Sequence, residues 1–145
     1  MLRKMLMMLS LVGMLVLSGC ASVPMASKSD DAKAKLFSPS SDKAVVYIYR
    51  SESLGAAIKM PLLIDGQTVG DTASKTYLRR ELAPGTHVIV SKTEVDSSVS
   101  IDMQAGQTYY VWQEVKMGMF AARSALHVVD ETKGRSEVQH CTLIL

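Results

Sequence analysis

Hydrophobic and polar positions change in character twice along this chain of 145 residues. A nearly unbroken apolar run fills most of residues 1–19, and a segment rich in Ser, Ala, Lys and Asp follows over residues 20–43. From Ala44 onward, short apolar runs alternate with turn-forming residues, a pattern typical of β-strands. The strands that it predicts span residues 44–50, 61–65, 67–70, 76–82, 86–94, 97–103, 108–115 and 125–129.

Three stretches make this prediction more specific. Residues 44–50 are apolar at both odd and even positions, which predicts a central strand buried on both faces. Residues 97–103 alternate between apolar and polar side chains, which predicts a half-buried strand. Asp65 and Gly66 predict a tight hairpin, because both central residues of such a turn need a positive φ.

These elements predict an all-β fold: a small antiparallel β-sandwich of about seven strands with a short C-terminal helix. Asp130 would cap that helix, which would extend to about His140. The expected segments are a cleaved signal peptide at 1–19, a lipidated tether at 20–43, the sandwich domain at 44–140 and an apolar tail at 141–145. We expect the tether to be flexible, because its few large apolar side chains cannot offset the entropy of ordering it.

The first residues resemble the signal peptide of a bacterial lipoprotein. Arg3 and Lys4 precede an apolar run that is too short to span a bilayer, which needs about 20 residues. The run ends in Leu17-Ser18-Gly19-Cys20, which is typical of a lipobox. We therefore expect cleavage before Cys20 and attachment of a diacylglyceryl group, with its acyl chains, to the Cys20 thiol through a thioether. The alternative is an ordinary signal peptide that carries a cysteine near its end.

Acylation would make membrane lipid the first partner of this protein, through acyl chains on Cys20. More than one chain gives lasting attachment, because a single chain binds a bilayer only reversibly. Ala21 and Ser22 follow the cysteine, where an Asp retains enterobacterial lipoproteins at the inner membrane. By this resemblance we expect a periplasm-facing protein that is lipid-anchored at the outer membrane.

Charge and cysteine content narrow the possible functions. Of the 16 Lys and Arg residues, Arg3 and Lys4 belong to the expected signal peptide, so the mature chain balances its 14 Asp and Glu residues. This neutrality argues against nucleic acid as a partner. With Cys20 acylated, Cys141 has no partner for an intramolecular disulfide. Its apolar neighbours predict a buried thiol, and a disulfide to another chain is the alternative.

The sequence contains no recognisable catalytic or metal-binding constellation. His87, His127 and His140 lack metal-ligand spacing, and we find no Gly-x-Ser-x-Gly nucleophile motif or glycine-rich phosphate loop. His140 and Cys141 would point to opposite faces of a strand. We therefore expect a protein without enzymatic activity, cofactor or metal site.

One segment interrupts the β pattern with side chains that a turn does not need. It contains Lys116, Met117, Met119, Phe120 and Arg123. A loop of this kind at one end of a sandwich could dock an envelope protein, a glycan or a lipid head group. The alternative is that Met119 and Phe120 fold back onto the core.

Short motifs in a fixed order also resemble a known family. They are Val46-Tyr47-Ile48-Tyr49-Arg50, Leu63-Ile64-Asp65-Gly66 with Val69-Gly70, Leu82-Ala83-Pro84-Gly85-Thr86-His87, Gly106-Gln107-Thr108-Tyr109-Tyr110-Val111 and Leu126-His127-Val128-Val129-Asp130. Over nearly all of residues 44–137 they resemble the bacterial lipoproteins grouped as domain of unknown function 2846. The resemblance implies a fold and an envelope location, and no catalytic residues.

We therefore expect a lipid-anchored envelope protein that acts as a non-catalytic binding or structural accessory module. Two alternatives remain open. Tyr109, Tyr110 and Trp112 could form a stacking surface for a glycan. The thioethers of Met117 and Met119 could bind Cu(I), because soft sulfur ligands select that ion.

Overall fold

The fold is known from a computed structural model that describes residues 20–145, so the expected signal peptide at 1–19 lies outside the described residues. These residues form nine strands and two helices, α2 (Lys28–Ala34) and α3 (Glu131–Gln139). The strands are β1 (Ala44–Arg50), β2 (Met60–Ile64), β3 (Gln67–Thr72), β4 (Thr76–Leu82), β5 (Gly85–Ser91), β6 (Ser97–Met103), β7 (Thr108–Lys116), β8 (Arg123–Val129) and β9 (Thr142–Leu143).

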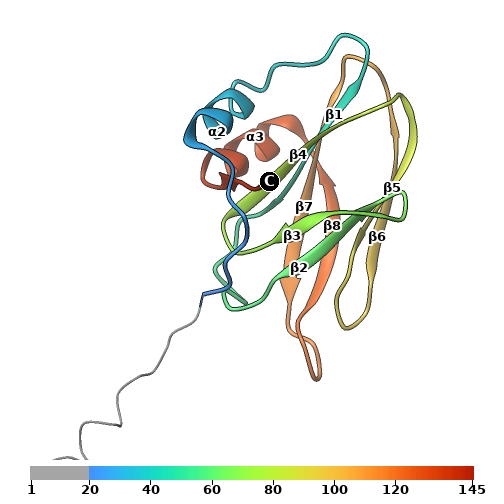
Figure 1. Ribbon diagram of the computed structural model, residues 1–145. Coiled ribbons are helices and arrows are strands. Elements are labelled where there is room, and N and C mark those ends of the chain that lie inside the picture. The colour runs from blue at the N-terminus through green and yellow to red at the C-terminus, as the bar shows by residue number, and fades with distance from the viewer. Residues whose placement is uncertain (1–19) are drawn as a thin grey trace, which may run out of the picture.

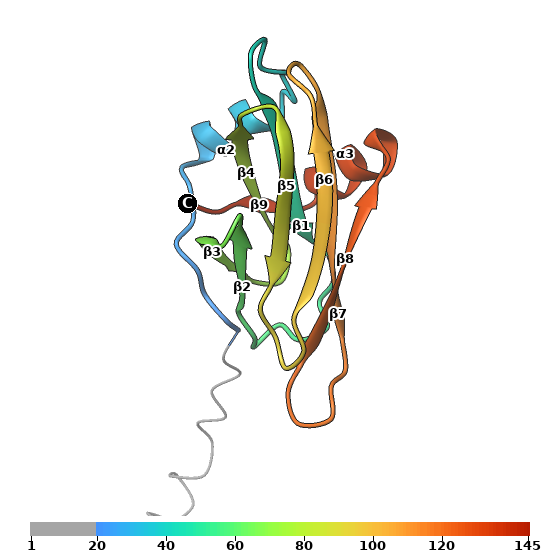
Figure 2. The same ribbon diagram turned by 90° about the vertical axis from the view of Figure 1, so that its right-hand side faces the viewer.

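The strands form two sheets that face each other (Figures 1 and 2). One sheet has the order β8-β7-β1-β4-β9 and the other has the order β3-β2-β5-β6. The predicted all-β sandwich with a short C-terminal helix is confirmed, with nine strands in place of about seven. Two pairs, β1–β7 and β4–β9, are parallel within these mostly antiparallel sheets. Their partners lie far apart in sequence, where no tight hairpin imposes an antiparallel arrangement.

The central strand is buried on both faces, as its uninterrupted apolar pattern predicted. All seven residues of β1 are buried, and the strand lies in the middle of the five-stranded sheet. Val46 and Ile48 face the second sheet and belong to the main core, whereas Val45 and Tyr47 face the two helices. The structure therefore has two apolar layers, one between the sheets and one beneath the helices.

Aromatic side chains build the layer beneath α2 and α3. The ring of Tyr47 lies 5.3 Å from the rings of both Phe37 and Tyr110, measured between centroids. The hydroxyl of Tyr47 donates a hydrogen bond to the carbonyl oxygen of Ala34 at 2.7 Å. This bond ties α2 to β1 and satisfies a polar group that burial would otherwise make costly.

The expectation of a flexible tether over residues 20–43 was wrong for most of that segment. Val23 and Phe37 are buried, Met25 pairs with Ile144 in an isolated β-bridge, and α2 lies on the sheet. Ser27 caps α2 by accepting a hydrogen bond from the backbone N–H of Asp30 at 3.1 Å. Two apolar side chains and one capped helix thus suffice to hold a segment that is polar on average.

The tail at 141–145 also belongs to the domain. Cys141 and Ile144 are buried, and β9 extends the five-stranded sheet beside β4. The predicted burial of the Cys141 thiol is confirmed, so a disulfide to another chain would require the tail to open. None of the helices in residues 20–145 is both long and apolar enough to cross a bilayer.

Candidate functional site

Three loops meet at one end of the sandwich. They are residues 51–59 between β1 and β2, 92–96 between β5 and β6, and 117–122 between β7 and β8. Both views place them together at the lower end of the molecule (Figures 1 and 2). We call these residues, with Lys116 and Arg123 at the base of the third loop, the loop end.

Strand β7 and the loop that follows it lie against the other two loops. β1 and β7 are parallel, so the loops that follow them leave the sheet at the same end. At Gly55 an added Cβ would lie 3.2 Å from Cγ1 of Val115 on β7. The backbone N–H of Glu94 donates to the carbonyl oxygen of Ala122 at 3.4 Å. The loop end is therefore one surface, built from segments that are distant in sequence.

The carboxylate of Glu94 organises the loop between β7 and β8. Its Oε2 accepts hydrogen bonds from the backbone N–H of Met119 at 3.1 Å and from Nε of Arg123 at 3.2 Å. The hydrogen bond from Arg123 lowers the pKa of Glu94 below its ordinary value. A Cβ on Gly118 would lie 2.1 Å from the same carboxylate oxygen and 1.8 Å from the carbonyl oxygen of Ala121. Only glycine fits there.

The predicted apolar side chains of this loop point into solvent. Met117 and Met119 are each 78% exposed, and Phe120 is 90% exposed. The alternative in which Met119 and Phe120 fold back onto the core is therefore wrong. The exposed thioethers remain accessible to a soft cation, so the copper alternative stays a prediction.

Apolar side chains from the other two loops surround these residues. Leu54 is 50% exposed, Ile58 37% and Val95 56%. Six of the eleven large apolar side chains that are exposed in residues 20–145 thus belong to the loop end. Single exposed apolar residues are ordinary on a protein surface, whereas a concentration at one end is typical of a contact surface.

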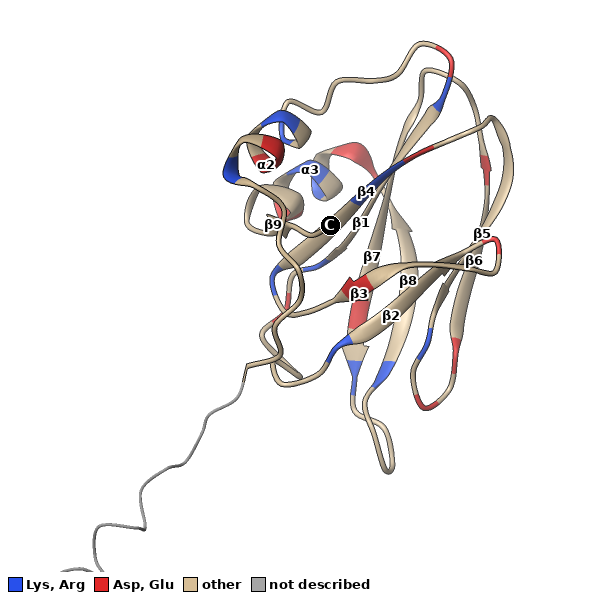
Figure 3. Cartoon of the chain, viewed as in Figure 1, with Lys and Arg blue, Asp and Glu red and all other residues tan. Residues whose placement is uncertain are grey.

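Basic residues lie at the bases of these loops (Figure 3). Lys59 and Lys116 are exposed, and Lys116 lies 3.5 Å from the carboxylate of Glu114. The acidic residues of the loop end are engaged by other side chains: Glu94 pairs with Arg123, Asp96 pairs with Lys92, and Glu52 accepts a hydrogen bond from Trp112.

The described chain begins at this same end. The backbone N–H of Ala21 donates a hydrogen bond to the carbonyl oxygen of Ala56, in the first loop, at 2.9 Å. Cys20 directly precedes Ala21 and is exposed. The predicted lipidation residue therefore lies beside the loop end.

Sequence reasoning identified one loop of this surface and missed the rest. Leu54, Ile58 and Val95 lie in segments that read as turns, where an apolar side chain without a periodic partner was the available signal. Glu94 gave no signal at all, because its partners Met119 and Arg123 lie 25 and 29 residues further along the chain.

The aromatic residues of β7 do not form a common exposed surface. Tyr109 packs on the core between the sheets, and Tyr110 is buried beneath the helices. Trp112 is partly buried, and its Nε1 donates to Oε1 of Glu52 at 2.8 Å. The ammonium of Lys133 lies 4.6 Å from the centroid of the Trp112 ring. The arrangement therefore gives the glycan alternative no open stacking platform on this strand.

The histidines take part in local contacts. His87 bonds to Asp65 through Nδ1 at 2.6 Å and to the carbonyl oxygen of Ala83 through Nε2 at 2.7 Å. His127 contacts Glu114 at 2.8 Å, and His140 is exposed at the end of α3. Within residues 20–145, no group of three or more His, Cys, Asp or Glu side chains is placed to hold a metal ion.

The Cys141 thiol is poorly suited to act as a nucleophile. It is buried, and its Sγ lies 3.7 Å from the carbonyl oxygen of Arg50. Burial, and next the nearby charge of Glu137, raises its pKa to about 12. A thiol attacks as the thiolate, which is scarce at neutral pH at this position.

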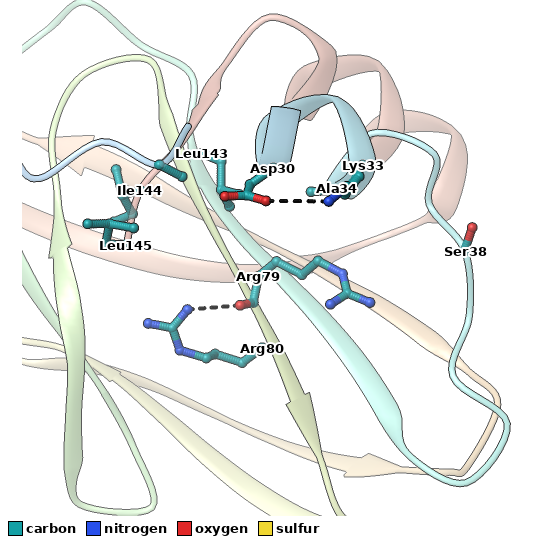
Figure 4. Close-up of a pocket in the computed structure, with 10 residues that line it drawn as sticks. Asp30, Lys33, Ala34, Ser38, Arg79, Arg80, Leu143, Ile144 and Leu145 are labelled. Carbon is teal, nitrogen blue, oxygen red and sulfur yellow. Dashed lines mark hydrogen bonds and ion pairs between the residues drawn. The ribbon is translucent and has the colours of Figure 1, made fainter. Parts of the chain in front are cut away.

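A pocket of about 410 Å³ lies between α2, β4 and the C-terminus (Figure 4). Arg79 and Arg80 line it, but protein groups already hold both guanidinium groups. Arg80 donates to the carbonyl oxygens of Arg79 at 2.9 Å and Val69 at 2.6 Å, and Arg79 pairs with Glu81 at 3.0 Å. Because both guanidinium groups already bind protein groups, we interpret the two arginines as structural residues.

Comparison with known proteins places the chain in a family. Residues 40–125, which include the whole loop end, match the family described as "Protein of unknown function (DUF2846)". A protein of Haemophilus influenzae, described as uncharacterized, is 34% identical over 132 residues, which are 89% of this chain and 79% of that protein. No solved structure matches the chain. The chain therefore belongs to the DUF2846 family of proteins of unknown function.

Proposed function

We propose that this protein is a lipid-anchored envelope protein that works by binding through its loop end and not by catalysis. The observation that carries the proposal is the position of Cys20. It is exposed, it follows a lipobox-like sequence, and the residue after it is already hydrogen-bonded to the loop end. The proposed anchor thus lies next to the first loop of this exposed apolar surface.

Cleavage before Cys20 is compatible with the fold. The contacts described above, from the N–H of Ala21 onward, join residues within 20–145, so removal of residues 1–19 leaves these contacts in place. Acyl chains on the Cys20 thiol contribute about 0.8 kcal/mol for each methylene that enters the bilayer. Ala21 and Ser22, in place of an Asp, favour the outer membrane with the domain facing the periplasm.

A binding role also suits the chemistry of the described residues. The titratable groups of the loop end stabilise its loops, since Glu94 holds Met119 and Arg123. Cys141 is buried and protonated, and His87 joins two turns. A catalytic site of the nucleophilic kind needs a nucleophile that is open to substrate, and the buried thiol of Cys141 does not provide one.

Mass spectrometry of the full-length protein expressed in a bacterium with two membranes tests this proposal. We expect an N-terminal peptide that begins at Cys20 and carries acyl chains, and recovery of the protein with the outer membrane. Cys20→Ser should lose the acyl mass, and Ala21→Asp should keep it but move the protein to the inner membrane. An unmodified Cys20 peptide, or cleavage at another residue, would contradict the lipid anchor.

A further inference from the structure

We propose that the loop end contacts the bilayer itself: Met117, Met119 and Phe120 enter the interface of the membrane that holds the acylated Cys20. This inference rests on the proposed lipid anchor and adds to it an orientation and a direct lipid-binding surface. Four features of the described residues support it.

The first feature is the absence of a spacer between anchor and domain. Cys20 is followed by Ala21, whose N–H is bonded to Ala56 at 2.9 Å, and by Val23, which is buried. Neighbouring Cα atoms lie about 3.8 Å apart, so acyl chains on Cys20 begin within one residue of the first loop. The domain must therefore rest at the membrane surface, with its loop end toward the lipid.

The second feature is the apolar character of the end that would face the lipid. Phe120 is 90% exposed, and Met117 and Met119 are each 78% exposed. Leu54 and Val95 add exposed apolar surface from the neighbouring loops. Removing this surface from water favours association with the apolar part of a bilayer.

The third feature is the charge around these tips. Lys59 and Lys116 are exposed beside them, and the carboxylates of Glu94 and Asp96 are compensated by Arg123 and Lys92 (Figure 3). Lysine side chains can run along apolar surface while the ammonium group meets lipid phosphates. This distribution fits an interface in which apolar tips lie deeper than basic groups.

The fourth feature is that the loop is held open before any contact is made. Glu94 binds the N–H of Met119 and the side chain of Arg123, and Gly118 leaves the room that this carboxylate needs. Phe120 is thereby kept in solvent and does not collapse onto the core. A surface that is already in its binding conformation loses less entropy when it binds.

These features favour a bilayer over a protein as the occupant. A protein partner would have to fit between the loop end and the membrane to which the adjacent Cys20 is tied. The bilayer, in contrast, is already there once the anchor has inserted, at a high effective concentration.

Tryptophan quenching by brominated lipids tests the inference on the full-length, lipidated protein. We would place Phe120→Trp and, as a matched control, Leu36→Trp separately in the chain. Leu36 is 70% exposed and follows α2, which lies toward the opposite end of the sandwich. Both proteins and the wild type would be reconstituted in vesicles of phosphatidylethanolamine and phosphatidylglycerol with brominated acyl chains. The wild type supplies the background of Trp112, the single native tryptophan.

We expect the added emission of Phe120→Trp to shift to shorter wavelength and to be quenched, and that of Leu36→Trp to remain unquenched. Equal, weak quenching of both variants on vesicle-bound, acylated protein would overturn membrane contact while leaving the anchor intact. Equal, strong quenching of both would overturn the proposed orientation. An N-terminal peptide without acyl chains, measured on the same sample, would overturn the anchor and this inference together.

Discussion

At the scale of single residues, His87 shows how one side chain can join two turns. Its Nδ1 lies 2.6 Å from a carboxylate oxygen of Asp65, in the β2–β3 turn, and its Nε2 lies 2.7 Å from the carbonyl oxygen of Ala83, before β5. Both partners are acceptors. A neutral imidazole has only one N–H, so the imidazolium form is needed to satisfy both contacts.

These contacts predict a pH dependence of stability. The carbonyl of Ala83 and then the carboxylate of Asp65 raise the pKa of His87 above its ordinary value of 6.5. The stabilisation from His87 is therefore complete below the unfolded-state pKa and is lost as the pH rises through the folded-state pKa. An NMR titration of the His87 ring should give a pKa above 6.5 that falls in Asp65→Asn. A value at or below 6.5, unchanged in Asp65→Asn, would contradict this account.

At the scale of elements, local sequence patterns predicted the strands and the hairpin well. They did not predict segments whose structure depends on contacts with residues far away in the sequence. The hairpin at Asp65 and Gly66 has φ of 51° and 78°, as its turn type demands, and β6 alternates as predicted. In contrast, α2 was missed because Lys28–Ala34 has no apolar stripe. Ser27 with Asp30 three residues later was the available cap signal.

Phe37 is the main apolar contact that we identify between the end of the α2 segment and the sheet. Its side chain is 7% exposed among the rings of Tyr47 and Tyr110, whereas the neighbouring Leu36 is 70% exposed. We expect Phe37→Ala to lower the free energy of unfolding by about 3 kcal/mol, and Leu36→Ala to change it by less than about 0.5 kcal/mol. Urea denaturation measures both. Equal, small effects of the two substitutions would indicate that this segment is a flexible tether and is not packed on the domain.

Helix α3 approaches the sheet through Gly134. A Cβ at this position would lie 2.2 Å from Cγ of Tyr110, close to the backbone of β7, where the ring has little freedom to move away. Alanine gains about 1 kcal/mol of helix propensity over glycine, but overpacking of a buried site costs about 1–3 kcal/mol. We therefore expect Gly134→Ala to destabilise the protein in urea denaturation, and Thr132→Ala, on the exposed face, to be nearly neutral. A more stable Gly134→Ala variant would show that α3 is not held this close.

At the scale of the whole molecule, the candidate surface could be predicted only in part. The Met-Phe loop was evident from sequence because its apolar residues break the strand pattern. The residues that surround this loop could not be predicted from sequence. Leu54 and Val95 lie beside it only because β1 pairs in parallel with β7 and because Glu94 contacts Met119. The position of Cys20 beside this surface likewise follows from the docking of Ala21 on Ala56.

Under our proposal, the domain and its lipid anchor form one unit with a defined orientation. A freely extended segment over residues 20–43 would allow a separation of roughly 8 nm at about 3.3 Å per residue. The packed segment allows almost none, because Ala21, Val23 and Phe37 are all held on the domain. With the proposed lipid anchor, this orientation would make the loop end the membrane-facing surface and leave the opposite end, with α2, facing the periplasm.

Neutron reflectometry of the lipidated, full-length protein on a supported bilayer can show whether the domain rests directly on the membrane. It measures the position of the protein layer relative to the lipid head groups. We expect a protein layer that begins within the head-group region, with no water layer between the protein and the head groups. A hydrated gap of several nanometres between the bilayer and the domain would contradict this expectation. It would show that residues 20–43 act as a flexible tether between the lipid and the domain.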